Sequence, residues 1–197
     1  MCAKLLILES PGKVKKVQSF LGPDWKVVAS VGHVRDLPVK EMGVAAPDFK
    51  PHYQPTERGA DVLKRLGALA KQADVVYLAT DPDREGEAIA WHVADALKLK
   101  DAKRVTYGEI TESAVKAAVQ SPRAIDMALV AAQEGRRVLD RFCGYLVSGP
   151  LSRAVGTRLS AGRVQSPALR LVVERERAIT SFVSVTHYGA ELSFEGW

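Results

Sequence analysis

Four carboxylates stand at alternate positions in one short stretch of the chain: Asp81, Asp83, Glu85 and Glu87, directly after the apolar run Val75–Ala79. In an extended segment, residues two apart point to the same side, so these side chains would crowd together. Crowded carboxylates repel one another and favour a hard divalent cation. Mg²⁺ takes one or two of them and shares phosphate oxygens. The stretch therefore predicts a Mg²⁺ site formed by some of these four carboxylates.

A structural explanation accounts for part of this acidic pattern. Asp81 before Pro82 is the N-cap-plus-proline signature of a helix start. Asp83 and Glu85 would then complement the helix dipole. That explanation covers one or two acids, whereas four occur within seven residues. The metal site is the favoured interpretation.

Glu9 is a second candidate, because it also follows an apolar run, Lys4–Leu8. If that run and Val75–Ala79 form adjacent strands, Glu9 and the acids share one edge of the sheet, where ligands of open α/β sheets bind. Glu9 would then join the metal site, and as a carboxyl among carboxylates it would have a raised pKa and could serve as a general acid. Taken alone, it could equally be an exposed acid. Lys13, near the start of a helix beginning at Pro11, would lie close to a bound phosphate.

In the segment 120–178, arginine takes the place of lysine as the positively charged residue. Residues 120–178 contain ten Arg, five acids and no Lys. The planar guanidinium suits phosphate, so this bias indicates phosphate recognition, although a biased genome composition could contribute. His33 lies in a glycine-bounded loop beside Arg35, which makes it a candidate for ligand contact, although a lone His is more often structural.

Strand-like and helix-like segments alternate up to residue 120. Strands are expected at 4–8, 25–31, 75–79 and 104–107, helices at 11–21, 57–72, 82–99 and 111–119, and an irregular connection at 32–55. Such alternation predicts an α/β fold: a mostly parallel sheet flanked by helices. Helical patterns follow at 125–147, 151–157 and 163–179, broken at Ser148–Pro150, and 183–194 alternates like a strand. The expected divisions are 1–120, 121–180 and 181–197, the last being the start of a truncated β region.

Composition excludes several classes of protein. The chain has 197 residues, 47% of them hydrophobic, and a net charge of +5. No apolar run approaches the roughly 18 residues of a membrane span. Two cysteines cannot build a disulfide framework or a four-ligand zinc site. We expect a cytoplasmic, nucleoid-associated monomer with no membrane partner.

Three long motifs carry a family resemblance. Leu8–Lys13 (LESPGK), Ser30–Pro38 (SVGHVRDLP) and Tyr77–His92 (YLATDPDREGEAIAWH) resemble the amino-terminal part of type IA DNA topoisomerases, the bacterial members in particular. The α/β part resembles their Toprim domain. Gly135–Arg141 and Leu159–Ser166 resemble the helical DNA-binding domain that follows it. The resemblance spans nearly the whole chain, to about Arg177.

The resemblance implies a reaction and a set of roles. Type IA enzymes relax negatively supercoiled DNA without ATP: a tyrosine cleaves one strand, another strand passes, and the break is resealed with Mg²⁺. Glu9, with Lys13 beside it, would be the catalytic acid, and Asp81, Asp83 and Glu85 the Mg²⁺ triad. Single-stranded or underwound DNA would contact His33, Arg136, Arg137, Asp140, Tyr145, Ser160, Ala161, Gly162, Arg163, Val164 and Gln165.

The chain departs from the family at two places. The segment Ser148–Ser152 has no aromatic residue where the family often places one. None of the chain's tyrosines stands in the family's Tyr-x-Arg-Thr-(Asp/Asn)-Ser context, so this chain lacks the nucleophile and the isolated chain should be inactive. Two rivals remain: a stand-alone Toprim Mg²⁺-dependent nuclease, and a DNA-binding module without catalysis.

Overall fold

The computed structural model describes residues 4–196 of the chain. In order, its elements are β1 (Lys4–Leu8), η1 (Pro11–Lys13), α1 (Val14–Leu21), β2 (Trp25–Ala29), β3 (Arg35–Asp36), β4 (Gln54–Pro55), α2 (Glu57–Ala70), β5 (Val75–Ala79), α3 (Arg84–Ala96), β6 (Lys103–Arg104), α4 (Glu112–Gln120), α5 (Met127–Val155) and α6 (Gln165–Thr180). They fall into two compact units, one up to Phe142 and one from Cys143 onward.

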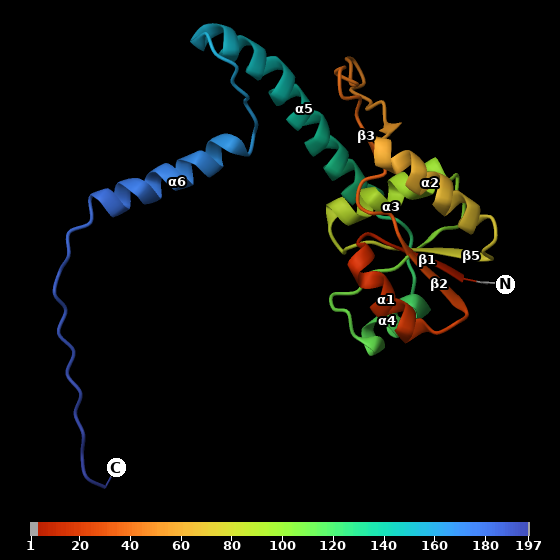
Figure 1. The fold of residues 1–197 in the computed structure, drawn as a ribbon, viewed down its shortest axis with the longest axis horizontal. Coiled ribbons are helices and arrows are strands. Elements are labelled where there is room, and N and C mark those ends of the chain that lie inside the picture. The colour runs from red at the N-terminus through yellow and green to blue at the C-terminus, as the bar shows by residue number, and fades with distance from the viewer. Residues whose placement is uncertain (1–3, 197) are drawn as a thin grey trace. The chain divides into compact units, whose positions relative to one another are not determined.

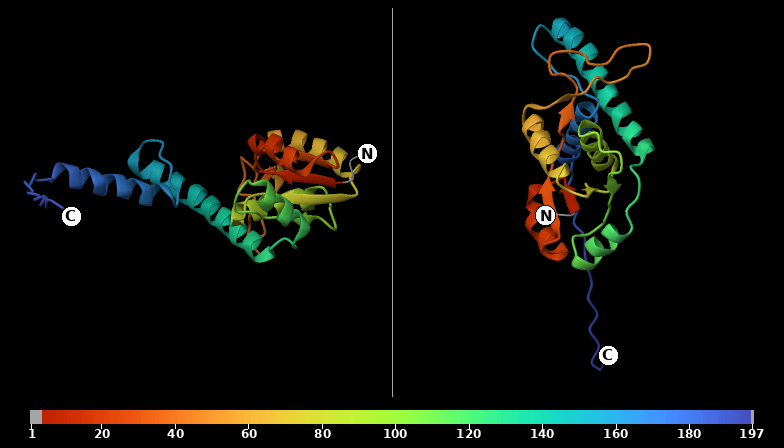
Figure 2. Two further views of the ribbon diagram at one scale, coloured as in Figure 1. Left: turned by 90° about the horizontal axis from the view of Figure 1, so that it is seen from below. Right: turned by 90° about the vertical axis from the view of Figure 1, so that its right-hand side faces the viewer.

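A four-stranded parallel sheet in the order β2-β1-β5-β6 forms the centre of the first unit. Successive residues of a strand face opposite sides of a sheet, so each of the two apolar central strands contributes to two cores. Leu5 and Ile7 pack with α2 and α3 on one face, and Leu6 and Leu8 pack with α1 and α4 on the other (Figure 1, with further views in Figure 2). This confirms the predicted α/β fold.

Polar caps fix where several helices begin. Thr56 accepts a hydrogen bond from the Gly59 N–H at the start of α2, and Thr111 accepts one from the Ala114 N–H at the start of α4. Each satisfies an amide that the first turn of a helix leaves without a partner. The predicted helices at 57–72 and 111–119 are therefore confirmed to within two residues.

The connection between β2 and α2 contains an unpredicted strand pair. β3 and β4 form a two-stranded antiparallel sheet, with Arg35 opposite Pro55 and Asp36 opposite Gln54. Two-residue strands are too short to show a periodic pattern, which is why the sequence indicates only an irregular segment. Their pairing returns the chain to the start of α2.

Four predicted elements of the later chain differ in the structure. The helix expected at 125–147 does not end before Ser148–Pro150 but continues as α5 to Val155, so that Pro150 lies inside it. The helix expected at 151–157 is part of this same α5. Proline costs the interior of a helix about 3 kcal/mol, and in α5 only Leu151–Val155 follow it. The strand expected at 183–194 is absent from the described chain, because a strand needs a neighbour to pair with and the described residues provide none. The strand expected at 104–107 is reduced to Lys103–Arg104.

The second unit contains the end of α5, a turn and α6. Two serines of α5 hold the turn: Ser148 Oγ accepts from the Ala161 N–H at 2.9 Å, and Ser152 Oγ accepts from the Leu159 N–H at 3.0 Å. Within residues 4–196 no helix is both long and apolar enough to cross a membrane.

Two glycines of α2 provide a matched test of the packing at the start of that helix. A Cβ on Gly59 would lie 2.0 Å from the Val34 carbonyl oxygen, whereas a Cβ on Gly67 would make only an ordinary 3.4 Å contact with Leu97. We expect Gly59→Ala to lower the free energy of unfolding by about 1–3 kcal/mol. Gly67→Ala should raise it by up to about 1 kcal/mol through helix propensity. Urea unfolding followed by tryptophan fluorescence measures both, and equal effects would contradict this packing.

Candidate active site at the carboxyl edge of the sheet

The register of the two central strands brings Glu9 and Asp81 to one edge. β1 and β5 pair in parallel with Leu8 opposite Ala79. Glu9 follows β1 and Thr80–Asp81 follow β5, so these residues leave the sheet side by side. The loop after β2 joins the same edge, because the Val31 N–H donates to the Glu9 carbonyl oxygen at 3.0 Å. The expected adjacency of Glu9 and the acidic stretch is confirmed.

The acidic stretch is a tight turn into α3. Asp83, and not Asp81, is the N-cap: its Oδ1 accepts from the Gly86 N–H at 2.7 Å. A Cβ on Gly86 would lie 2.1 Å from the Asp81 carbonyl oxygen, so the turn closes this tightly only with glycine there. The expected helix start at Pro82 is wrong, because α3 begins at Arg84.

Alternate spacing does not gather the four acids on one side, because the stretch is extended only at its start. Glu85 and Glu87 already lie in the first turn of α3. Two helical residues two apart differ in direction by about 200°. Glu87 consequently points inward and is fully buried against Arg104, while Glu85 is exposed. Glu87 is therefore not part of a carboxylate cluster at the surface.

Each remaining acid of the stretch has a partner. Lys13 Nζ donates to Asp81 Oδ1 at 2.7 Å, and His33 Nε2 lies 3.1 Å from Glu85 Oε1. Burial raises the pKa of Glu9, and the negative charges of Asp81, Asp83 and Glu85 raise it further. The main chain of Asp81 lowers this pKa in part. The structure thus brings Lys13 and His33 to the acids at this edge, contacts that the sequence did not predict.

The acids suit Mg²⁺ by chemistry but are not gathered as a formed metal cage. All the donors are carboxylate oxygens, and after burial the charges of Asp81, Asp83 and Glu85 contribute to the raised pKa of Glu9. Yet no three His, Cys, Asp or Glu side chains within residues 4–196 converge closely enough to hold a metal. A bound cation would replace Lys13 as the partner of Asp81 and His33 as the partner of Glu85. The Mg²⁺ site stays a prediction.

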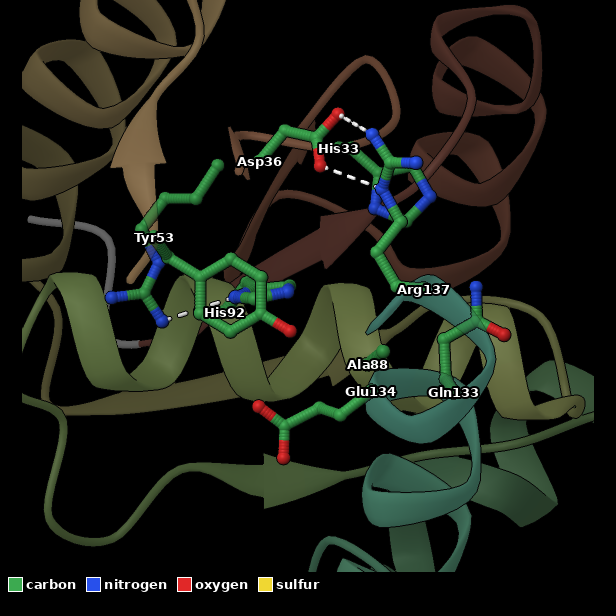
Figure 3. A pocket seen from close by; sticks show the side chains of 9 residues that line it. His33, Asp36, Tyr53, Ala88, His92, Gln133, Glu134 and Arg137 are labelled. Atoms are coloured by element: carbon green, nitrogen blue, oxygen red, sulfur yellow. Dashed lines mark hydrogen bonds and ion pairs between the residues drawn. The ribbon is translucent and has the colours of Figure 1, made fainter. Parts of the chain in front are cut away.

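A small polar cavity lies beside this site, between α3, the β3–β4 pair and α5 (Figure 3). Its volume is about 60 Å³. Arg35 lies beside it, with its guanidinium 5.8 Å from the Tyr53 ring and 5.4 Å from the Trp91 ring. Arg35 Nη1 also donates to Asp95 Oδ2 at 2.6 Å, and Arg35 Nη2 lies 3.1 Å from His92 Nδ1. Burial and the Arg35 charge lower the pKa of His92 to about 3, so His92 is a neutral acceptor.

Arg137 joins α5 to the β3 strand. Its Nε and Nη2 donate to the two carboxylate oxygens of Asp36 at 2.8 and 2.7 Å, as Figure 3 shows. Burial alone would raise the pKa of Asp36, but these bonds keep it below its ordinary value. Arg136 Nε lies 3.7 Å from Asp140 Oδ2, one turn further along α5. Arg141, whose role the sequence leaves open, is buried and donates to the carbonyls of Pro38 and Glu41.

The other predicted DNA-contact residues belong to the second unit. Tyr145 is 42% exposed, and the turn with Ser160, Ala161, Gly162, Arg163, Val164 and Gln165 is held to α5 by the two serines described above. Ser160 Oγ and Gln165 Nε2 lie 3.3 Å apart and brace the turn. Contact of these residues with DNA remains a prediction.

Two family models together match almost the whole chain. One describes the Toprim domain and matches residues 4–112, and the other describes DNA topoisomerase and matches residues 124–196. The chain belongs to the Toprim-containing DNA topoisomerases. It is 65% identical to "DNA topoisomerase I, plasmid" of Xylella fastidiosa (strain 9a5c) over 97% of its own length and 29% of that protein. It also matches the structure of full-length topoisomerase I from Thermotoga maritima with a TM-score of 0.77 and 44% identity, over 91% of this chain and 31% of that one. The chain spans less than a third of either relative.

Sequence reasoning missed the buried polar groups behind the site. Glu87 is followed by Ala88, Ile89 and Ala90, and Arg104 precedes Val105, so apolar neighbours could have signalled that both are buried. Nothing in the sequence pairs Asp36 with Arg137 or Arg35 with His92. Those partners lie 101 and 57 residues apart in the chain.

His92 predicts a pH dependence of stability. Its pKa is about 3 in the folded chain and about 6.5 when unfolded, so in that window the unfolded state binds more protons. Stability is therefore retained above about pH 6.5 and falls as the pH drops towards 3, by up to about 1.4 kcal/mol per unit. His92→Gln keeps an acceptor for Arg35 without the titration. We expect urea unfolding to show a shallower pH slope for this variant, and identical slopes would contradict a neutral buried His92.

Proposed function

We propose that this chain carries the acid and metal-binding half of a type IA DNA topoisomerase, together with part of its groove for single-stranded DNA. The observation that carries the proposal is the shared edge at which β1 and β5 deliver Glu9, Asp81, Asp83 and Glu85, with Lys13 and His33 among them. The whole enzyme would relax negatively supercoiled nucleoid DNA in the cytoplasm, without ATP, by cleavage, strand passage and religation.

Glu9 is suited to hold and transfer the proton of this reaction. Its raised pKa keeps the carboxyl protonated to higher pH than an ordinary glutamate, so it can serve as a general acid for an oxygen leaving phosphorus. Lys13 reaches the same acids from the first helix and could turn to a phosphate oxygen when DNA arrives. Mg²⁺, when bound by Asp81, Asp83 and Glu85, would neutralise phosphate charge during resealing.

The described tyrosines are poorly suited to be the nucleophile. Tyr77 is buried in β5, and Tyr53 packs edge-on against His92. Burial raises the pKa of both Tyr53 and Tyr107, which disfavours the phenolate. Neither Tyr145 nor Tyr188 stands in the family's Tyr-x-Arg-Thr-(Asp/Asn)-Ser context. We therefore propose that the nucleophile comes from a part of the enzyme outside this sequence.

Relaxation of supercoiled plasmid DNA directly tests whether the nucleophile lies outside this sequence. With Mg²⁺, the isolated chain should neither relax supercoiled plasmid nor form a covalent adduct, because conserving the phosphodiester energy requires a covalent nucleophile. Native gels measure relaxation and denaturing gels reveal adducts. A ladder of topoisomers, or an adduct on any of the five tyrosines, would overturn the proposal. Nicking without an adduct would instead favour a Mg²⁺-dependent nuclease.

Single-stranded DNA binding tests the role of α5. Arg136 is 36% exposed and paired only loosely with Asp140, so it can turn to phosphate. We expect Arg136→Ala to weaken binding of an oligonucleotide regardless of its sequence and to reduce the salt slope by about one. Arg58→Ala, on the exposed face of α2, removes an equal charge and serves as the control. Fluorescence anisotropy at several salt concentrations decides, and equal slopes for the two variants would exclude Arg136 from the interface.

A further inference from the structure

Glu87 lies at the centre of a buried ionic cluster behind the acidic turn. Its side chain and that of Arg104 are both fully buried. Glu87 accepts from Arg104 Nε at 2.9 Å, from Arg123 Nη1 and Nη2 at 2.7 and 2.8 Å, and from the Asp126 N–H at 2.7 Å. These donors hold its pKa below the ordinary value, although burial alone would raise it. A buried carboxylate so fully satisfied is a fixed anion.

Arg104 uses the rest of its guanidinium on main-chain carbonyls, that of Val105 at 2.6 Å from Nη1 and three at the end of β5. Nη1 donates to the carbonyls of Leu78 and Thr80 at 3.2 and 2.8 Å, and Nη2 donates to the Asp81 carbonyl at 2.8 Å. Glu9 leaves the sheet beside this segment, because the β1–β5 ladder ends with Leu8 opposite Ala79. The main chain of Asp81 is thus held by Arg104 at the edge where Glu9 lies.

The same anion is tied to the start of α5. The main chains of Arg104 and Arg123 exchange two hydrogen bonds of 2.9 and 2.8 Å, which places Arg123 against Glu87. Asp126 gives its N–H to Glu87 and caps α5 with its side chain, which accepts from the Ala128 N–H at 2.9 Å. One carboxylate therefore links the acidic turn to the first turn of α5.

We propose that Glu87 is a positioning residue: through Arg104 it fixes the main chain of Asp81 beside Glu9, and through Arg123 and Asp126 it couples that position to the start of α5. This rests on the proposed function, since it assigns the cluster to the Mg²⁺ and acid site. Glu87 touches neither the ion nor the DNA. The fourth acid of the motif thereby differs in role from the three before it.

The outer partner can be tested without disturbing the core. Arg123 is 41% exposed, so Arg123→Ala leaves Glu87 with Arg104 and the Asp126 amide. Arg65→Ala is the control, because Arg65 also holds a strand-end carbonyl, that of Ala29 at 3.0 Å, but not the acidic turn. In metal-free ¹⁵N spectra, Arg123→Ala should shift the amides of residues 81–83, and Arg65→Ala should not. Shifts confined to residues 122–128 would overturn the proposal.

Mg²⁺ binding provides the second measurement. In the wild-type chain, Mg²⁺ should shift the amide signals of residues 81–85. Shifts elsewhere would contradict the proposed metal site, whereas the comparison of variants in metal-free spectra would still stand. Loss of a group that orients a metal ligand typically weakens metal affinity about 10-fold or more. We expect Glu87→Gln to weaken Mg²⁺ binding by this factor. We expect Arg123→Lys to restore part of the Mg²⁺ affinity that Arg123→Ala loses. If Glu87→Gln does not fold, the two Arg123 variants decide. Unchanged Mg²⁺ affinity in Arg123→Ala, with shifts absent at 81–83, refutes the role.

Discussion

The parallel ladder between β1 and β5 is the constraint on which the rest of the site depends. Leu8 and Ala79 are paired at its end, so the next residues of both strands emerge at one edge of the sheet. A shift of one residue would turn the apolar side chains of each strand towards the opposite core. Since both faces of these strands are buried, the register is fixed by packing, and with it the distance between Glu9 and Asp81.

Charge compensation then decides how the acids coexist at that edge. Lys13 compensates the charge of Asp81, His33 lies within hydrogen-bonding distance of Glu85, and Arg104 and Arg123 neutralise the buried carboxylate of Glu87. The exposed pairs contribute little to stability, because water screens them, so a cation or phosphate can exchange with them. Breaking the buried pair would leave an unpaired charge in the core, which is strongly unfavourable. The edge therefore combines an exchangeable outer layer with a fixed inner one.

The first part of α5 belongs to the α/β unit. Arg137 pairs with Asp36, Arg141 donates to two carbonyls of the segment after β3, and Asp126 gives its amide to Glu87. The sequence predicts a domain boundary at residue 120, because the alternation of strands and helices ends there. The compact unit extends to Phe142, because these polar contacts hold the helix there.

The sequence alone determined the α/β class, helices such as α2 and α4, and the residues that could do chemistry, because apolar periodicity and the composition of short motifs are local properties. It placed Glu9 and the acidic stretch at one edge, on the condition that two strands be adjacent. Tertiary structure decided that adjacency, and it assigned the acids to different roles: Asp83 as a helix cap, Glu85 facing His33, and Glu87 turned inward to Arg104. Those outcomes depend on the turn into α3 and on partners far along the chain. No pattern of neighbouring residues encodes such contacts.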